Sequence, residues 1–295
     1  MDRILFGDNQ FFAVNHMSEE KSRAQALRFR ETADIMKVLD KAYDLGIHVF
    51  MCTTHDRISE VCDHVRAHPS RYADFRFYPC MPYAHKYWNA VTELGILGSL
   101  KQFFPGNVVN SLLQGGVSAA RRDYIGMMKL LVDAEMAMFR GLPIEYVFLQ
   151  NVVTDLLLGL GLPDVFKAFD DYVREKYDAK AGFITMNLPM LLDTLERAGV
   201  AYPTVCASIN KAGFRMCGGR DRVEGLLREG RCEAIAMQVL AAGAIPPREA
   251  LEYVCGLEGV QSILFGASSE QNIRQTRDLV LNYGTQPSER ATVKV

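Results

Sequence analysis

The 295-residue chain lacks the features that mark several classes of protein. No apolar run approaches the roughly 20 residues that cross a bilayer, and the N-terminus has no signal-peptide pattern. The formal net charge of -2 is too small to attract nucleic acid or an anionic membrane surface. No two of the seven cysteines form a CxxC pair, which argues against a zinc knuckle or a thioredoxin-like motif. We therefore expect a cytoplasmic protein with reduced thiols. Its expected partner is a small-molecule substrate, with no nucleic acid and no membrane partner. The sequence does not determine its oligomeric state.

Short apolar segments alternate with amphipathic ones along most of the chain. Hydrophobic residues make up 49% of the sequence, which is enough for a sizeable core. Strands are expected at 4–7, 47–51, 75–82, 144–149, 181–186, 204–209, 234–240 and 262–264. Helices are expected at 31–45, from 56 onward, and at 119–140, 164–177, 188–198, 220–228, 247–255 and 268–283. A doubly wound sheet in two halves would also alternate, but no linker divides the chain. We therefore predict an α/β fold with a single (β/α)8 TIM barrel over residues 1–283.

Two stretches depart from this alternation. Residues 83–117 contain a Pro105-Gly106 turn and several aromatic residues, and they are too long for an ordinary strand-to-helix loop. Because they follow the third strand, we expect an insertion that forms a lid over the barrel mouth. Residues 284–295 have no apolar pattern and are expected to form a mobile tail.

Polar side chains follow nearly every predicted strand, and in a barrel these strand ends meet at one mouth. Burying such groups without partners costs roughly 1–3 kcal/mol each, so we expect a ligand or water among them. The residues expected to carry catalysis are Asp8, His55, Asp56, His85 and Lys211. Those expected to bind the substrate are Asn9, Gln10, Tyr83, Lys86, Gln150, Asn151, Asn187, Asn210 and Gln238.

His55 and Asp56 each have a second interpretation. Either side chain could act as a general acid or base at the mouth of a pocket. Asp56 could instead serve only as the N-cap of its helix, with His55 a solvated turn residue.

A metal site is a weaker alternative to one without metal. His16, His55 and His85 come from the loops of three neighbouring strands, and three such ligands would suit an open catalytic site for a divalent ion. Their spacing is not local, and histidines in loops are mostly polar surface, so we expect no metal. Lys211 could form a Schiff base, hold a substrate phosphate or carboxylate, or be an exposed lysine.

The turn before the last helix could bind an anion. Ser268 fits an N-cap with Gln271 three residues later, Gly266 permits close backbone approach, and the first helical turn offers free N–H groups. A plain helix cap is the other interpretation. The residues expected to bind a cofactor here are Gly266, Ala267, Ser268, Ser269 and Asn272.

The same turn carries a family resemblance. Gly266-Ala267-Ser268-Ser269, followed by Ile273, resembles the turn that holds the phosphates of NADP in the aldo-keto reductases. Further matches in the same order are Phe50, Ser59-Glu60, Asn187, Asn210 and Leu240-Ala241-Ala242-Gly243. The resemblance covers residues 31–279 and implies an aldo-keto-reductase-like barrel with phosphate binding, and NADP as a possible cofactor.

The chain departs from this family at the residues that carry its chemistry. The resemblance places the family's catalytic Asp at Met51, its Tyr at Asp56, and its Lys at Cys80 or Pro82. The positions of its catalytic His and of the Tyr that stacks on nicotinamide fall on Gln150 and Met237. The resemblance thus implies a divergent member with a degenerate catalytic tetrad.

Three hypotheses about function follow. We favour an enzyme that acts on a small polar carbonyl, sugar or phosphorylated metabolite by acid–base chemistry of the isomerase or lyase type. The second is an NAD(P)H-dependent oxidoreductase with a different proton donor, such as His55 or Tyr83. The third is a catalytically inactive barrel that binds a metabolite or nucleotide.

Overall fold

Eight parallel strands close into one barrel, each hydrogen-bonded to its neighbours in chain order and β1 to β8. The computed structural model describes residues 1–12, 19–83 and 117–284. The strands are β1 (Ile4–Gly7), β2 (Val49–Thr53), β3 (Arg76–Met81), β4 (Tyr146–Leu149), β5 (Lys180–Thr185), β6 (Thr204–Ser208), β7 (Glu233–Met237) and β8 (Val260–Phe265). The predicted (β/α)8 barrel is therefore confirmed.

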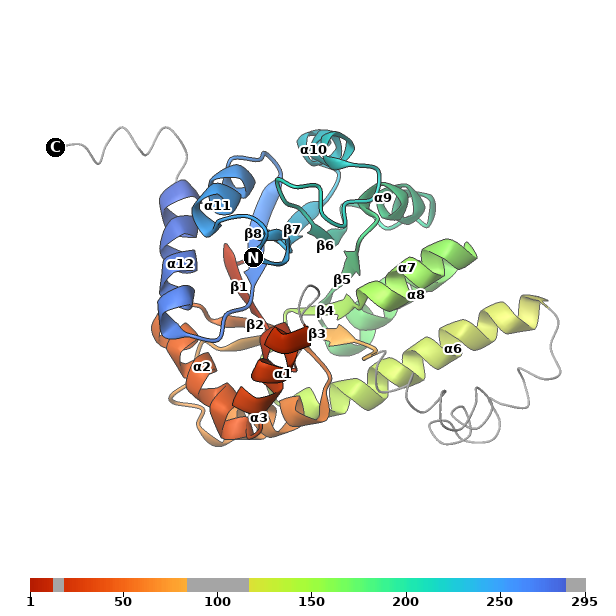
Figure 1. Cartoon of the computed structure of the whole chain (residues 1–295). Helices are drawn as coiled ribbons and strands as arrows, with labels where there is room; N and C mark the ends of the chain where they lie inside the picture. The colour runs from red at the N-terminus through yellow and green to blue at the C-terminus, as the bar shows by residue number, and fades with distance from the viewer. Residues whose placement is uncertain (13–18, 84–116, 285–295) are drawn as a thin grey trace.

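Helices surround the barrel, and the long helix α6 projects beyond the ring (Figure 1). The helices are α1 (Glu19–Arg28), α2 (Thr32–Asp44), α3 (Asp56–Ala67), α6 (Val117–Met136), α7 (Asn151–Leu160), α8 (Pro163–Tyr177), α9 (Leu188–Arg197), α10 (Arg220–Glu229), α11 (Pro247–Cys255) and α12 (Glu270–Gly284). A short 3-10 helix, η1 (Asn9–Phe11), follows β1. None of the helices in the described ranges is long and apolar enough to cross a membrane.

Several sequence expectations need correction or lie outside the described ranges. Helix α7 was not expected, because its exposed face carries Val152, Leu156 and Leu160 and so blurs the amphipathic pattern. Residues 84–116, which make up nearly all of the expected lid and include His85 and Lys86, lie outside the described residues, as do His16 and 285–295.

The apolar core has two parts, one on each side of the strands. The larger part packs the outer face of the barrel against the helices. The smaller part fills the barrel interior with side chains that include Leu5, Tyr146, Phe148 and Ile235. Phe148 is fully buried, and a Cβ added to Gly182 on the neighbouring strand would lie 2.2 Å from its ring. The barrel is thus a packed core that cannot act as a pore.

Hydrogen bonds link side chains at the lower end of the barrel interior, which is the end where the strands begin. The Tyr78 hydroxyl donates to Glu145 at 2.9 Å. Glu233 accepts from the Tyr146 hydroxyl at 3.1 Å and from the Thr204 hydroxyl at 2.8 Å. These bonds satisfy the polar ends of large interior side chains at the end of the barrel away from the mouth, and they stabilise the fold there.

Gly182→Ala should destabilise the fold by about 1–3 kcal/mol, because the new methyl group would overlap the ring of Phe148 in a filled interior. Gly225→Ala is the matched control. Nothing lies within 4 Å of a Cβ added there, so the change should stabilise α10 by about 0.5–1 kcal/mol. Urea unfolding of both variants measures the two effects. Equal stability of Gly182→Ala and the parent would contradict the packing of Phe148.

Candidate functional site

A cavity of about 440 Å³ opens at the C-terminal ends of the strands. Its floor is apolar and includes Met51, Ile184, Met237 and Leu264. Polar groups from the loops after β1, β3, β4, β6 and β7 stand around this floor. An apolar floor with a few convergent polar groups is the usual form of a small-molecule site.

Asp8 is the one carboxylate that lines this cavity among the described residues. It follows β1 directly, and its side chain is only 5% exposed. Its Oδ2 accepts hydrogen bonds from the backbone N–H of Thr53 at 2.8 Å and from the Thr53 hydroxyl at 2.6 Å. Burial raises the pKa of Asp8 above its ordinary value, although the Thr53 bonds act in the opposite direction. Asp8 is therefore suited to exchange a proton nearer neutral pH than an exposed aspartate.

Tyr83 stands on the cavity wall next to this acid. Its backbone N–H donates to both oxygens of Glu135, at 3.2 and 3.1 Å, and the Thr54 hydroxyl donates to the same buried carboxylate. Burial, followed by the charges of Asp8 and Asp56, raises the pKa of the Tyr83 phenol. The phenol therefore stays protonated and can donate a hydrogen bond to a ligand.

Cys80 also lines the cavity, but its chemistry is blocked. Burial, followed by the charge of Asp8, raises the pKa of this thiol well above its ordinary value. Because the thiolate is the nucleophilic form, Cys80 is an apolar wall residue here.

Two glutamine side chains present unsatisfied oxygens at the cavity. Gln10 is 5% exposed, and its Nε2 donates to the Gly7 carbonyl at 2.8 Å, which leaves Oε1 buried without a partner. Gln25, on α1, also has a buried Oε1 without a partner. Sequence reasoning missed Gln25, because the charged residues around it predicted a segment on the outside of the barrel.

Most of the other amide side chains predicted at the mouth line the cavity, but one caps a helix instead. Asn9, Gln150, Asn151 and Gln238 line the cavity as expected. Gln238 has a positive φ of 55° and accepts a hydrogen bond from the Ser208 hydroxyl at 2.9 Å. By contrast, Asn187 does not line the cavity: its Oδ1 accepts from the Met190 N–H at 3.3 Å and so caps α9.

His55 and Asp56 lie behind the cavity wall. His55 is the N-cap of α3 and its Nδ1 accepts from the Arg57 N–H at 3.1 Å, so the expected capping by Asp56 is wrong. The His55 ring stacks on Phe12 with ring centres 4.1 Å apart, and Phe12 lines the cavity in its place. Asp56 is exposed in the first turn of the helix. Neither residue reaches the cavity formed by the described residues.

The loop after β6 differs most from expectation. Asn210 is fully buried and bonds within its own loop, and Lys211 pairs with Glu249 at 2.8 Å, so neither lines the cavity. Arg215 lines it instead. No local pattern marked this arginine, since its position depends on how the loop folds.

The expected cofactor turn is largely engaged by the protein itself. Gln10 Oε1 lies 2.0 Å from where a Cβ on Gly266 would stand, and Arg28 of α1 donates to the Ser268 carbonyl. Ser269, not Ser268, caps α12: its hydroxyl accepts from the Asn272 N–H at 3.3 Å. Of the five expected cofactor residues, only Gly266 lines the cavity, and Ala267 lies partly buried beside it. Gly266 is exposed and Ala267 to Ser269 are half-buried, so the turn is open to solvent, but the cavity lining does not extend past Gly266 to Ser268 and Ser269, where the resemblance places the NADP phosphates.

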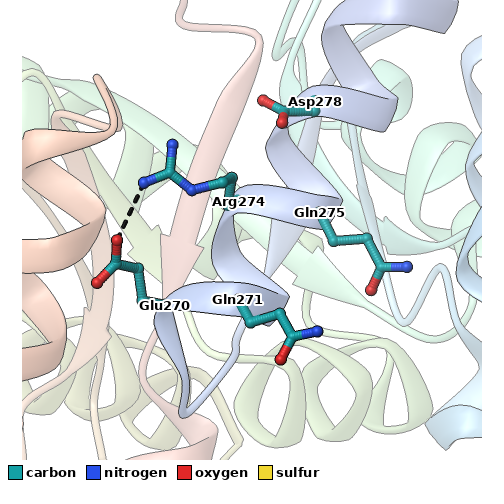
Figure 2. A pocket seen from close by; sticks show the side chains of 5 residues that line it. All are labelled: Glu270, Gln271, Arg274, Gln275 and Asp278. Carbon is teal, nitrogen blue, oxygen red and sulfur yellow. Dashed lines mark hydrogen bonds and ion pairs between the residues drawn. The ribbon is translucent and has the colours of Figure 1, made fainter.

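A second hollow runs along the surface of α12 and has no convergent chemistry. Figure 2 shows its five side chains, Glu270, Gln271, Arg274, Gln275 and Asp278, all from this one helix. Arg274 pairs with Glu270 at 3.0 Å, and Glu270 also pairs with Lys41 at 3.3 Å.

The described residues contain only part of the alternative metal site. Across 1–12, 19–83 and 117–284, no three His, Cys, Asp or Glu side chains gather as they would around a metal ion. Two of the three histidines of the alternative site, His16 and His85, lie outside the described residues.

Asp8→Asn should stabilise the protein near neutral pH. Folding raises the pKa of Asp8, so the folded state favours the protonated acid. The free energy of unfolding therefore falls as the pH rises from the pKa of Asp8 in the unfolded state to its pKa in the folded state. In that window the parent should lose about 1.4 kcal/mol per pH unit relative to Asp8→Asn, and below it the difference should be constant. Urea unfolding of both proteins over a pH series measures this. A pH-independent difference would contradict a desolvated Asp8.

Comparison with known proteins supports the fold. No family model matches the sequence, and no curated protein matches it. Among solved structures, a protein assigned as an aldo-keto reductase of Pseudomonas aeruginosa is similar, with a TM-score of 0.59 and 12% identity over 96% of this chain and 91% of that one. A protein assigned as 2,5-diketo-D-gluconic acid reductase B is similar with a TM-score of 0.55 and 12% identity over 99% of this chain and 86% of that one. This chain therefore has the barrel fold seen in aldo-keto reductases.

Proposed function

We propose that this chain is an enzyme that acts on a small polar carbonyl compound, sugar or phosphorylated metabolite by acid–base chemistry of the isomerase or lyase type. The observation that carries the proposal is the buried Asp8 carboxylate in the cavity, beside the protonated phenol of Tyr83. A carboxylic acid with a raised pKa next to a neutral hydroxyl donor is a suitable pair for moving a proton next to a carbonyl group.

The two side chains divide the reaction between them. Both Thr53 donors bind Oδ2 of Asp8, so Oδ1 is the oxygen that takes a proton from the carbon next to the substrate carbonyl. The electrons of the broken C–H bond move into an enolate, whose oxygen accepts a hydrogen bond from the Tyr83 hydroxyl. Where the carbon that lost its proton carries a hydroxyl group, that hydroxyl proton moves to the enolate oxygen, and protonated Asp8 returns its proton to the former carbonyl carbon, which completes the isomerisation. In the lyase variant, the enolate expels a leaving group instead.

The unsatisfied glutamine oxygens support a ligand in this cavity. A buried acceptor without a partner costs roughly 1–3 kcal/mol, and Gln10 and Gln25 each carry one at the cavity. Each oxygen is itself closed off from the cavity surface, so a ligand hydroxyl group would reach it only after the glutamine side chain changes rotamer. These positions favour a hydroxylated substrate.

The residues at the mouth do not favour the reductase mechanism. Met51, Cys80 and Gln150 stand at positions where the resemblance places the family's catalytic Asp, Lys and His, and all three line the cavity. A thioether, a high-pKa thiol and an amide do not transfer protons at neutral pH. We therefore propose that the tetrad is degenerate.

Reduction with NAD(P)H is the second candidate, and the reductase-like fold favours it. Tyr83 would then be the proton donor, since it is protonated and lines the cavity. The cavity does not extend from Gly266 to Ser268 and Ser269, which argues against a dinucleotide that spans both. A barrel that only binds a metabolite is the third candidate.

Seven free thiols, five of them buried, support a reducing compartment such as the cytoplasm.

Proton exchange in heavy water tests the preferred function without a nicotinamide. Incubation of the protein with a panel of hydroxylated aldehydes, ketones, keto acids and sugar phosphates in D2O should place deuterium next to the carbonyl of the true substrate, seen by proton NMR. Asp8→Asn should slow this exchange by about 10²–10⁴-fold, because the proton acceptor is lost. Tyr83→Phe should also slow it while leaving substrate affinity nearly unchanged. Asn187→Ala, which changes only a helix cap, is the control; parent-like exchange in Asp8→Asn would exclude this mechanism.

Titration with NADPH tests the second candidate. We expect no saturable change of protein or cofactor fluorescence at high micromolar NADPH, because Gln10 packs on Gly266 and Arg28 holds the Ser268 carbonyl. Gln10→Gly removes the side chain that packs on Gly266 and serves as the comparison. Tight binding to the unaltered protein would restore the oxidoreductase hypothesis.

A further inference from the structure

The loop between β6 and α10 is held in one shape by a buried amide. Asn210 Oδ1 accepts from the Phe214 N–H at 2.8 Å, and its Nδ2 donates to the Phe214 carbonyl at 2.9 Å. Farther along, the Cys217 N–H donates to the Met186 carbonyl at 3.1 Å, which fastens the loop to the end of β5. Asn210 therefore positions this loop, and the loop positions Arg215, one of the two residues between Phe214 and Cys217.

Arg215 adopts a backbone conformation that arginine rarely takes. Its φ is +54°, in the left-handed region, which costs a residue with a side chain on the order of 1–2 kcal/mol. Non-glycine residues held in this region by their surroundings gather at functional sites. The conformation places Arg215 on the cavity wall, with its guanidinium 5.3 Å from the centre of the Phe214 ring.

The charge of Arg215 is not neutralised as the charges of its neighbours are. Lys211 pairs with Glu249 at 2.8 Å, and Arg220 pairs with Glu224 at 3.4 Å. Among the described side chains, no carboxylate lies within ion-pair distance of Arg215, and it is the one cation on the cavity wall. Arg215 is exposed at the cavity, and a guanidinium with no carboxylate partner suits the planar oxygens of a carboxylate or phosphate.

We propose that Arg215 binds an anionic group on the substrate, so that the cavity takes a small hydroxylated carboxylate or phosphate ester. This inference rests on the proposed function, which concerns the end of the substrate that reacts at Asp8. It adds the chemical nature of the other end of the substrate. Asp8 follows β1 and Arg215 follows β6, with β7 and β8 between these strands in the ring. A bound anion at Arg215 thus keeps its charge away from the Asp8 carboxylate.

Thermal unfolding with three simple probes tests the anion site. The probes are inorganic phosphate, D-gluconate and D-glucitol, which keeps the hydroxyl groups of gluconate without its charge, all at matched ionic strength. Phosphate or gluconate should raise the unfolding temperature of the parent in a concentration-dependent way, and glucitol should not. Arg215→Gln should weaken this binding about 10-fold or more, since a hydrogen-bonded charge is lost.

Two further variants keep the test decisive. Lys211→Gln removes a cation from the same loop but outside the cavity, so it should bind the anion like the parent. Arg215→Gly suits the positive φ, so it should fold at least as well as the parent and still lose the anion effect. Stabilisation by gluconate alone assigns a carboxylate, and stabilisation by phosphate assigns a phosphate group; either supports the site. Equal stabilisation by glucitol, no stabilisation by either anion, or unchanged anion binding in both Arg215 variants overturns it.

The two proposals can fail separately. Asp8→Asn should keep the anion effect, because Asp8 does not contact the anion. If Asp8→Asn loses deuterium exchange while the Arg215 variants keep anion binding, the anion site is wrong and the proposed function stands. If the Arg215 variants lose anion binding while Asp8→Asn keeps exchange, the reverse holds.

Discussion

Pairing of β1 with β8 closes the barrel, and the site depends on this closure. Leu5 and Phe6 pair in register with Leu264 and Phe265, which brings the loops of the first and last units together. Gln10 consequently lies over Gly266, and Arg28 reaches the Ser268 carbonyl. One wall of the cavity is therefore made from residues more than 200 positions apart in the sequence. The same contacts fasten the turn between β8 and α12 to the first unit of the barrel.

The filled interior confines chemistry to one end of the barrel. Below the cavity, Phe148 packs into the space left by Gly182, and Tyr78 and Tyr146 extend the packing to a hydrogen-bonded lower end. An apolar floor of this kind raises the free energy of a carboxylate above it. Asp8 is held there by the two Thr53 donors, so a group that opposes folding at neutral pH is retained where it can react.

Local patterns predicted the barrel well, because strands and helices differ in the period of their apolar residues. The strand 4–7 and the helix 247–255 were predicted to the residue, and strand ends led directly to Asp8, Gln10, Tyr83 and Gln150. Tertiary contacts decided the rest. The stacking of His55 on Phe12 and the loop bonds of Asn210 turn two expected site residues into supporting ones. Arg215 was out of reach, since its placement depends on bonds that no sequence spacing reveals.

The residues of this cavity are spread over almost the whole length of the chain. Asp8 and Gln10 are among the first to be synthesised, whereas Gly266 directly follows the last strand. A growing polypeptide on the ribosome would carry the acid early but would have no floor or far wall around it until β8 had emerged. The enclosure that tunes Asp8 is thus completed only with the last strand, which delays any reactivity of this group until synthesis of the barrel is nearly complete.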